Sequence, residues 1–456
     1  MKERESLGSR LGFILLSAGC AIGIGNVWRF PYMVGENGGG LFVIAYVIFL
    51  LALGVPIMTM EYAIGRSSRV SILSAYKKLE PKGTKWHLFG YLAILGNYLL
   101  LMFYSVVSGW ILRYFVLSVR GAFIGSDTES IADIYATMME SPGILIFYMG
   151  VTMVITIFVT SMGLQKGVER VTKIMMIALI IIMFFLGIRS LTLPGAGEGV
   201  KFYLMPNAEN VKKVGLGNVL YGALNQSFFT LSLGIGSMEI FGSYIKKEKS
   251  LLGEALLVAG LDTFVAIVAG LITIPACFAF GVAPDKGPSL IFLTLPNVFA
   301  SMKGGRVLGS LFFLFMYFAA LSTMIGVFEN DVSFSIDLFG RDRNKAALYA
   351  GIIITLGSIP CALGFNVWSS FQPLKAGNVI MDLEDFIVSN LLLPVGALVC
   401  CLFCTCRYGW GFDNYIEEVN SGSGLKINRV FKWYFRIILP LILLFLTVYG
   451  IISYFQ

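Results

Sequence analysis

The sequence predicts an all-α integral membrane protein whose first and sixth membrane helices are discontinuous. Hydrophobic residues make up 57% of its 456 residues and charged residues only 13%. Apolar stretches of about 20 residues, the length that spans a bilayer, recur along the chain. Inside the first stretch, between Gly19 and Pro31, three glycines, an asparagine, an arginine and a proline occur at about mid-membrane depth. Such residues weaken or break a helix.

The apolar stretches define the expected membrane helices. Eleven are long enough to span a bilayer, at residues 11–34, 41–66, 88–115, 142–160, 170–190, 216–244, 254–280, 305–337, 346–364, 382–406 and 434–454. They leave little chain for a soluble domain. We therefore expect one membrane domain over residues 1–456, with a short charged leader at 1–10.

The basic residues alternate between successive loops and predict the orientation. They gather in the leader and in the loops after the second, fourth, sixth, eighth and tenth stretches, whereas residues 121–140 carry four acids and no base. Because cytoplasmic loops are rich in Lys and Arg, we expect a plasma (inner) membrane protein with a cytoplasmic N-terminus and an external C-terminus. This asymmetry accounts for the net charge of +7 without a nucleic-acid partner.

The cysteines do not indicate a disulfide framework. Four of the seven, Cys400, Cys401, Cys404 and Cys406, cluster near the end of the tenth stretch. A Cys-x-x-Cys pair is one signature of a metal site, but small apolar residues on a buried helix explain the cluster better. The sequence offers no metal cluster, nucleophile–base pair or nucleotide motif, so it does not predict an enzyme.

The sixth stretch is interrupted like the first. Between Gln226 and Glu239, threonine, serine and glycine gather at mid-membrane, five stretches after the first break. Backbone groups freed in a membrane are tolerated only where they face protein, water, ions or substrate. Breaks at matching places in two halves favour a transport site between inverted repeats. We therefore expect repeats at 11–190 and 216–406, five helices each, with 434–454 as helix 11. The alternative is close helix packing at small residues.

Other polar residues also lie inside apolar stretches. Asp262 falls in the seventh stretch, and an intramembrane carboxylate is a functional candidate by default. Ser322 and Thr323 fall in the eighth, where hydrogen bonding back to their own helix is the competing explanation. Arg29 follows the first break and needs a partner, for which Asp385 is the obvious candidate.

Three motifs carry a specific resemblance. They are Asn26-Val27-Trp28-Arg29-Phe30-Pro31, Glu36-Asn37-Gly38-Gly39-Gly40 and Phe228-Phe229-Thr230-Leu231-Ser232-Leu233-Gly234. The chain resembles the neurotransmitter:sodium symporter family from the leader through the eleventh stretch. Within the family it is most similar to the bacterial amino-acid branch with the leucine-transporter fold, and there to multi-hydrophobic amino-acid transporters.

The resemblance implies two sodium sites made of oxygen ligands. The residues matching the first are Ala21 (carbonyl), Asn26, Thr230 and Asp262. Those matching the second are Gly19, Ile22 and Ala319 (carbonyls), Ser322 and Thr323. Chloride-dependent relatives carry asparagine where this chain has Asp262, so we expect that chloride is not required.

The resemblance also implies the substrate. Amine transporters of the family carry an acid at the position of Gly23, so a glycine there favours a substrate that brings its own carboxylate. The matching binding residues are Ala21, Gly23, Ile24, Gly25, Leu100, Tyr104, Phe229, Ser232, Ile235, Met324 and Val327. The side-chain pocket is apolar, which favours aliphatic and aromatic L-amino acids.

Gates complete the expected mechanism of alternating access. The resemblance implies an outer gate of Arg29 and Asp385, and an inner gate of Arg4 and Asp337 with Tyr244 nearby. The function it implies is sodium-coupled symport of hydrophobic L-amino acids. The alternatives are a non-concentrating channel or facilitator and a substrate-sensing receptor on the same scaffold. Ile177 stands where the family often has proline; the resemblance leaves open its consequence, the preferred amino acid, the ion stoichiometry, proton antiport and the oligomeric state.

Overall fold

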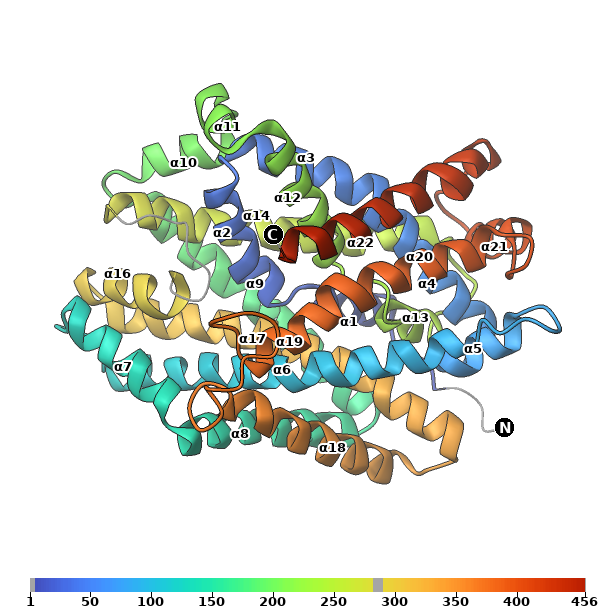
Figure 1. Ribbon diagram of the computed structural model, residues 1–456, viewed down its shortest axis with the longest axis horizontal. Coiled ribbons are helices and arrows are strands. Elements are labelled where there is room, and N and C mark those ends of the chain that lie inside the picture. Colours follow the sequence, from blue (N-terminus) through green and yellow to red (C-terminus); the bar gives the residue numbers. More distant parts are fainter. Residues whose placement is uncertain (1–4, 282–289, 456) are drawn as a thin grey trace.

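The computed structural model describes residues 5–281 and 290–455, and it contains helices but no strand in that part of the chain (Figure 1). Its first half comprises α1 Arg10–Ala21, η1 Gly25–Arg29, α2 Phe30–Glu36, α3 Gly40–Phe49, η2 Leu50–Gly54, α4 Val55–Ser68, α5 Ile72–Leu79, α6 Leu88–Arg120, α7 Thr128–Glu140, α8 Pro142–Ser161, η3 Leu164–Glu169 and α9 Arg170–Leu191. The predicted all-α class is confirmed.

The second half continues the bundle. It comprises α10 Ala196–Leu204, α11 Ala208–Val214, α12 Leu216–Phe229, α13 Ser237–Gly242, α14 Leu251–Ala279, η4 Leu290–Thr294, α16 Leu295–Ser301, α17 Gly305–Phe339, α18 Arg343–Leu363, α19 Ile380–Asp385, η5 Phe386–Leu392, α20 Leu393–Thr405, α21 Phe412–Val419, η6 Arg429–Phe431, η7 Tyr434–Ile438 and α22 Leu439–Phe455.

Among the described residues, nine helices are long and apolar enough to cross a membrane. A tenth span is the bent pair Arg10–Ala21 and Gly25–Glu36, whose two parts meet at 57°. These ten match all the predicted stretches except the sixth. There α12 and α13 are separated by a break, so neither is long enough to span alone. The count of eleven includes this interrupted pair and stays a prediction.

Prolines explain most of the irregular turns inside the spans. The π-helical turns η1, η2, η4, η5 and η7 each end two residues before a proline, at Pro31, Pro56, Pro296, Pro394 and Pro440. Proline has no N–H, and its ring crowds the carbonyl four residues earlier; a wider turn relieves this. One freed carbonyl, that of Ala52, accepts a hydrogen bond from the Tyr434 hydroxyl instead.

The two breaks have different backbone geometry. In the first, α1 ends at Ala21 and Ile22 turns to an extended ψ of 93°. In the second, residues 230–236 form turns, with positive φ at Ser232 (51°), Gly234 (98°) and Gly236 (75°). A Cβ on Gly234 would lie 2.1 Å from the Leu393 carbonyl oxygen, so only glycine fits there.

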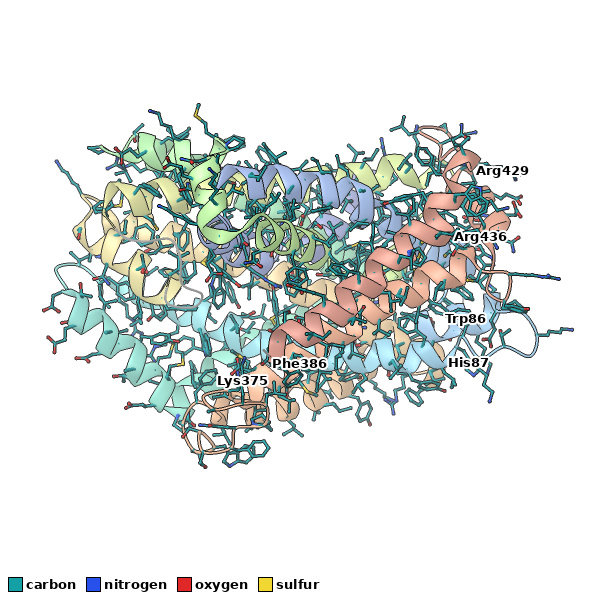
Figure 2. All side chains as sticks on the ribbon, turned by 45° about the horizontal axis from the view of Figure 1, so that its top comes forward. Trp86, His87, Lys375, Phe386, Arg429 and Arg436 are labelled. Atoms are coloured by element: carbon teal, nitrogen blue, oxygen red, sulfur yellow. The ribbon has the colours of Figure 1, made fainter. Side chains whose placement is uncertain are left out.

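The long helices place both breaks at the centre of the bundle. Helix α1 packs against α17, α14 and α9, and α13 packs against α4. The short helices α5 and α21 lie at one end of the bundle, and α7, α10, α11 and α16 lie at the other (Figure 1). Figure 2 shows Trp86, His87, Arg429 and Arg436 toward the first end, whereas Lys375 and Phe386 lie nearer the middle of the view.

Candidate functional site

Asp262 is the centre of a buried polar cluster between the two breaks. Asn26 Nδ2 donates to Asp262 Oδ1 at 2.8 Å and to the Thr230 hydroxyl oxygen at 3.0 Å, and the Thr230 hydroxyl donates to Asp262 Oδ2 at 3.0 Å. The Tyr46 hydroxyl lies 3.5 Å from Asp262 Oδ2. The fold thus joins α14 to both interrupted spans through the three side chains predicted for the first sodium site.

A second cluster surrounds the Thr323 hydroxyl on α17. Its oxygen lies 3.3 Å from the Gly19 carbonyl oxygen, 3.2 Å from that of Ile22 and 3.3 Å from that of Ala319. A hydroxyl has one proton, so it cannot satisfy three carbonyls at once. Ser322 instead donates to the Ala319 carbonyl of its own helix at 3.0 Å. The Gly19 and Ile22 carbonyls therefore converge on a hydroxyl that can satisfy only one of them, a shortage of donors that is also found in cation sites.

Gly23 lies between the two clusters. Its amide donates to Asn26 Oδ1 at 3.2 Å, and the neighbouring Ile24 amide donates to the Tyr104 hydroxyl at 2.9 Å. A Cβ on Gly23 would lie 2.5 Å from the Tyr104 hydroxyl and 2.7 Å from the Thr323 hydroxyl. The backbone of the break thus approaches both side chains too closely for any other residue without a shift.

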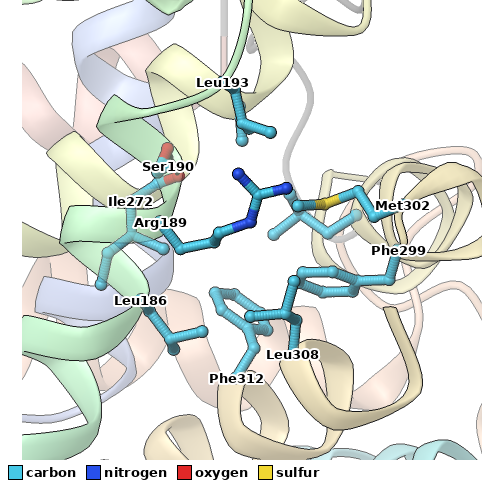
Figure 3. A pocket seen from close by; sticks show the side chains of 11 residues that line it. Leu186, Arg189, Ser190, Leu193, Ile272, Phe299, Met302, Leu308 and Phe312 are labelled. Carbon is cyan, nitrogen blue, oxygen red and sulfur yellow. Dashed lines mark hydrogen bonds between the residues drawn. The ribbon is translucent and has the colours of Figure 1, made fainter. Parts of the chain in front are cut away.

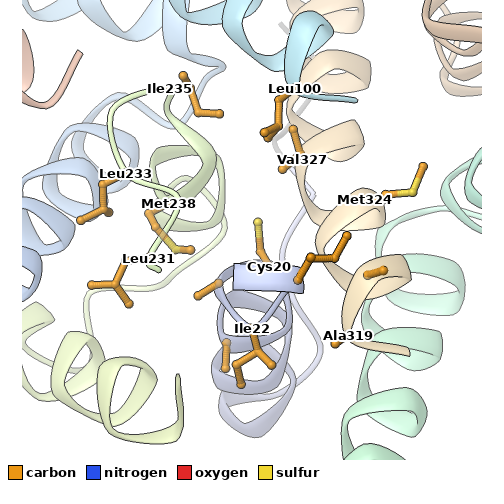
Figure 4. Packing of buried hydrophobic residues seen from close by; sticks show 14 of the residues in the cluster. Cys20, Ile22, Leu100, Leu231, Leu233, Ile235, Met238, Ala319, Met324 and Val327 are labelled. Carbon is orange, nitrogen blue, oxygen red and sulfur yellow. The ribbon is translucent and has the colours of Figure 1, made fainter. Parts of the chain in front are cut away.

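The predicted pocket residues are apolar and surround the breaks. Leu100, Ile235, Met324 and Val327 are buried, and Figure 4 shows them with Cys20 and Ile22 around the end of α1. Phe229, Tyr104 and Ser232 are partly buried.

Glu61 on α4 was missed by the sequence analysis. Its carboxylate accepts the Gly234 amide at 2.6 Å and the Met238 amide at 3.1 Å, and so holds the second break from the side. The signal was available, because a carboxylate inside an apolar stretch is a functional candidate on the same ground as Asp262. Gln226 is a second polar residue whose contact was not predicted. Its Nε2 donates to the Gly25 carbonyl at 3.1 Å and links the two breaks.

The predicted outer gate residues make other contacts here. No ion pair joins Arg29 to Asp385 in the described part of the chain. The Arg29 guanidinium lies 4.1 Å from the centre of the Phe229 ring, and Asp385 accepts a hydrogen bond from the Ser389 hydroxyl at 2.7 Å. The pairing of the two charges stays a prediction.

The other end of the site is closed by a polar network. Asp337 accepts the Ser71 amide at 2.6 Å, while Arg4 lies outside the described residues. Tyr244 donates to Glu329 at 2.7 Å, and Arg343 pairs with the same buried carboxylate. These contacts join the turn that follows α13 to α17 and α18.

Two cavities lie away from these residues. One, of about 20 Å³, is lined by α9, α14, α16 and α17 around Leu186, Phe299 and Phe312 (Figure 3). It has room for about one water and is too small for an amino acid. The other, of about 350 Å³, lies between Arg10, Glu254 and Leu425. Neither is lined by a predicted site residue, so we place the candidate site at the breaks, on their geometry.

Two interrupted helices that bring backbone oxygens and a buried carboxylate together inside a membrane bundle define a secondary transporter. The sequence matches the sodium:neurotransmitter symporter family over residues 4–124 and 128–456. The chain belongs to this family and is a multi-pass, sodium-coupled membrane transporter and not an enzyme.

Individual relatives agree with this assignment. The chain is 36% identical over the full length of both proteins to an uncharacterized sodium-dependent transporter, YhdH, of Bacillus subtilis. It is 24% identical to the rat sodium- and chloride-dependent taurine transporter, over 99% of this chain and 79% of that one. The structure is similar to that of MhsT in complex with L-phenylalanine, with a TM-score of 0.88, 37% identity, and coverage of 98% of this chain and all of that one.

Proposed function

We propose that this transporter imports hydrophobic L-amino acids together with two sodium ions and without chloride, by alternating access. The observation that carries the proposal is the pair of oxygen clusters at Asp262 and Thr323, which share the broken segment 19–26. Sodium is a hard cation and prefers oxygen ligands. The donor shortage around Thr323 and the carboxylate of Asp262 fit two such ions.

The charges explain why chloride is not needed. Asp262 supplies one negative charge within the first cluster, and a substrate carboxylate supplies a second beside Gly23. Two sodium ions are then balanced without a further anion. The rat taurine relative is described as chloride-dependent, so this part of the proposal separates the chain from that relative.

The substrate class follows from Gly23 and the pocket. A substrate carboxylate fits the amides near Gly23 because N–H groups at a helix break attract anions. The buried side chains of Leu100, Ile235 and Val327 favour an apolar side chain. The phenylalanine complex of MhsT supports this choice.

Uptake into proteoliposomes tests the proposal. An inward sodium gradient is expected to concentrate labelled leucine or tryptophan above equilibrium, equally well with chloride or gluconate, and lysine and serotonin are the comparison substrates. Equilibration without accumulation would indicate a facilitator, and binding without uptake would indicate a receptor. A requirement for chloride would overturn the charge-balance argument.

A further inference from the structure

The carbonyl of Ile235, in the second break, is held by two buried amide side chains. Asn97 on α6 donates from Nδ2 at 2.9 Å, and Asn330 on α17 donates from Nδ2 at 3.2 Å. All three residues are fully buried. The donors come from the two longest helices of the bundle, which pack against each other.

The two asparagine side chains make few other hydrogen bonds. Asn97 also donates to the Ala93 carbonyl of its own helix at 2.9 Å. The side-chain oxygens of Asn97 and Asn330 are buried and have no hydrogen-bond partner among the described residues. Burying such acceptors is costly. Donation to Ile235 offsets this cost for Asn330, and for Asn97 it does so together with donation to Ala93.

The segment around Ile235 is closely packed where it meets α20, since a Cβ on Gly234 would lie 2.1 Å from the Leu393 carbonyl oxygen. It lies between Gly234 and Gly236, both with positive φ, and glycine imposes little restriction on its backbone. Glu61 holds the Gly234 amide, whereas Asn97 and Asn330 are the partners of the Ile235 carbonyl among the described residues. The Ile235 side chain lies against α6, where a Cβ on Gly96 would come 3.0 Å from Ile235 Cγ2.

We propose that Asn97 and Asn330 are positioning residues that set the size limit of the substrate pocket by fixing the wall formed by Ile235. This inference rests on the proposed function. With the carbonyl held, the wall cannot move away from a bulky substrate. With both donors removed, the carbonyl is left unpaired, and the glycine-flanked segment rearranges to find a partner and widens the pocket.

The test compares Asn97→Leu, Asn330→Leu and the double variant. Either single change leaves one donor on the carbonyl, so the ratio of the leucine and tryptophan dissociation constants is expected to change less than about threefold. The double change leaves a buried carbonyl unpaired. The penalty for such a group is equivalent to a roughly 5- to 150-fold change in an equilibrium constant. We expect it to shift the ratio at least about tenfold toward tryptophan.

Two controls identify the cause. Asn297→Leu makes the same chemical change on α16, where in the described part of the chain the amide donates to the Leu293 carbonyl one turn earlier, and is expected to leave the ratio unchanged. Ile235→Ala removes the wall side chain directly and is expected to shift the ratio in the same direction. It tests separately that the Ile235 side chain forms the wall of the pocket.

The outcomes separate this inference from the proposed function. Equal loss of affinity for leucine and tryptophan in the double variant would show a structural role only and would overturn the inference. An unchanged ratio in Ile235→Ala would do the same. Absence of sodium-dependent amino-acid binding by the parent would instead overturn the proposed function, and this inference with it.

Discussion

Replacing Gly23 tests the centre of the site most directly. The structure leaves no room for a side chain there, because a Cβ would lie 2.5 Å from the Tyr104 hydroxyl and 2.7 Å from the Thr323 hydroxyl. Gly23→Ala must therefore displace at least one of them. Displacing Tyr104 breaks its hydrogen bond with the Ile24 amide, and displacing Thr323 opens the second oxygen cluster.

The expected effect can be estimated from these contacts. Overpacking a buried position costs about 1–3 kcal/mol, and the lost hydrogen bond adds about 1 kcal/mol. When the displaced hydroxyls must return to their places for substrate to bind, this sum of about 2–4 kcal/mol opposes binding and raises the amino-acid dissociation constant by roughly 30- to 1,000-fold. Tyr104→Phe removes the closer of the two hydroxyls, so combining it with Gly23→Ala is expected to restore part of the affinity.

The assay is equilibrium binding of leucine across a sodium titration. The parent, Gly23→Ala, Gly23→Asn and Gly23→Asp form the series, in which asparagine matches aspartate in size without the charge. A carboxylate beside the substrate carboxylate adds like-charge repulsion, so Gly23→Asp is expected to bind more weakly than Gly23→Asn. Gly23→Ala within threefold of the parent would refute the steric argument, and equal affinities of Asn and Asp variants would place the substrate carboxylate elsewhere.

Four further changes have defined outcomes. Asp262→Asn is expected to make sodium-driven uptake depend on chloride; full activity in chloride-free buffer would contradict the charge balance. Ile177→Pro removes a backbone hydrogen bond within α9 at a cost of about 3 kcal/mol. Because this cost falls on the intact helix, the change is expected to favour an opened form and to raise turnover and cytoplasmic accessibility to a cysteine reagent. No gain in a folded variant would show that opening of α9 does not control release. Arg66→Met removes the 2.7 Å ion pair with the buried Glu418, which keeps Lys247 at 2.8 Å as a second partner, and is expected to cost about 1–3 kcal/mol of stability in thermal unfolding; an unchanged midpoint would show that the pair adds nothing. Asp331→Leu removes a fully buried carboxyl with no hydrogen-bond partner in the described residues and is expected to raise the melting temperature by removing a penalty of about 1–3 kcal/mol; a lower one would reveal a missing partner.

The sequence predicted the spans well because hydrophobicity is a local property. The predicted stretch 41–66 corresponds to the helix Gly40–Ser68, and 142–160 to Pro142–Ser161. Both breaks were also predicted, since glycine and polar residues in an apolar stretch are visible without any tertiary information.

Contacts between segments that are far apart in the chain were harder to predict from the sequence. The resemblance brought Asn26, Thr230 and Asp262 together, but it did not indicate that Glu61 holds the second break. Nor did it indicate that Asn97 and Asn330 donate to the same carbonyl. These two residues are 233 positions apart in the chain, and both reach the Ile235 carbonyl of a third segment. The orientation of Arg29 toward Phe229 depends on side-chain packing, which no local pattern encodes.

The π-helical turns before the five prolines have a consequence for how this chain tolerates changes in length. A π turn holds one residue more than the α turn it replaces. Deleting one residue from an ordinary membrane helix rotates everything beyond it by about 100° and turns its lipid face inward. Deleting one residue from Leu50–Gly54 can instead be absorbed by tightening that turn, which leaves α4 and Glu61 facing the same neighbours but brings the Pro56 ring back against the carbonyl four residues earlier. These turns are therefore the places where a single-residue deletion changes the local turn and leaves the helix beyond it in register.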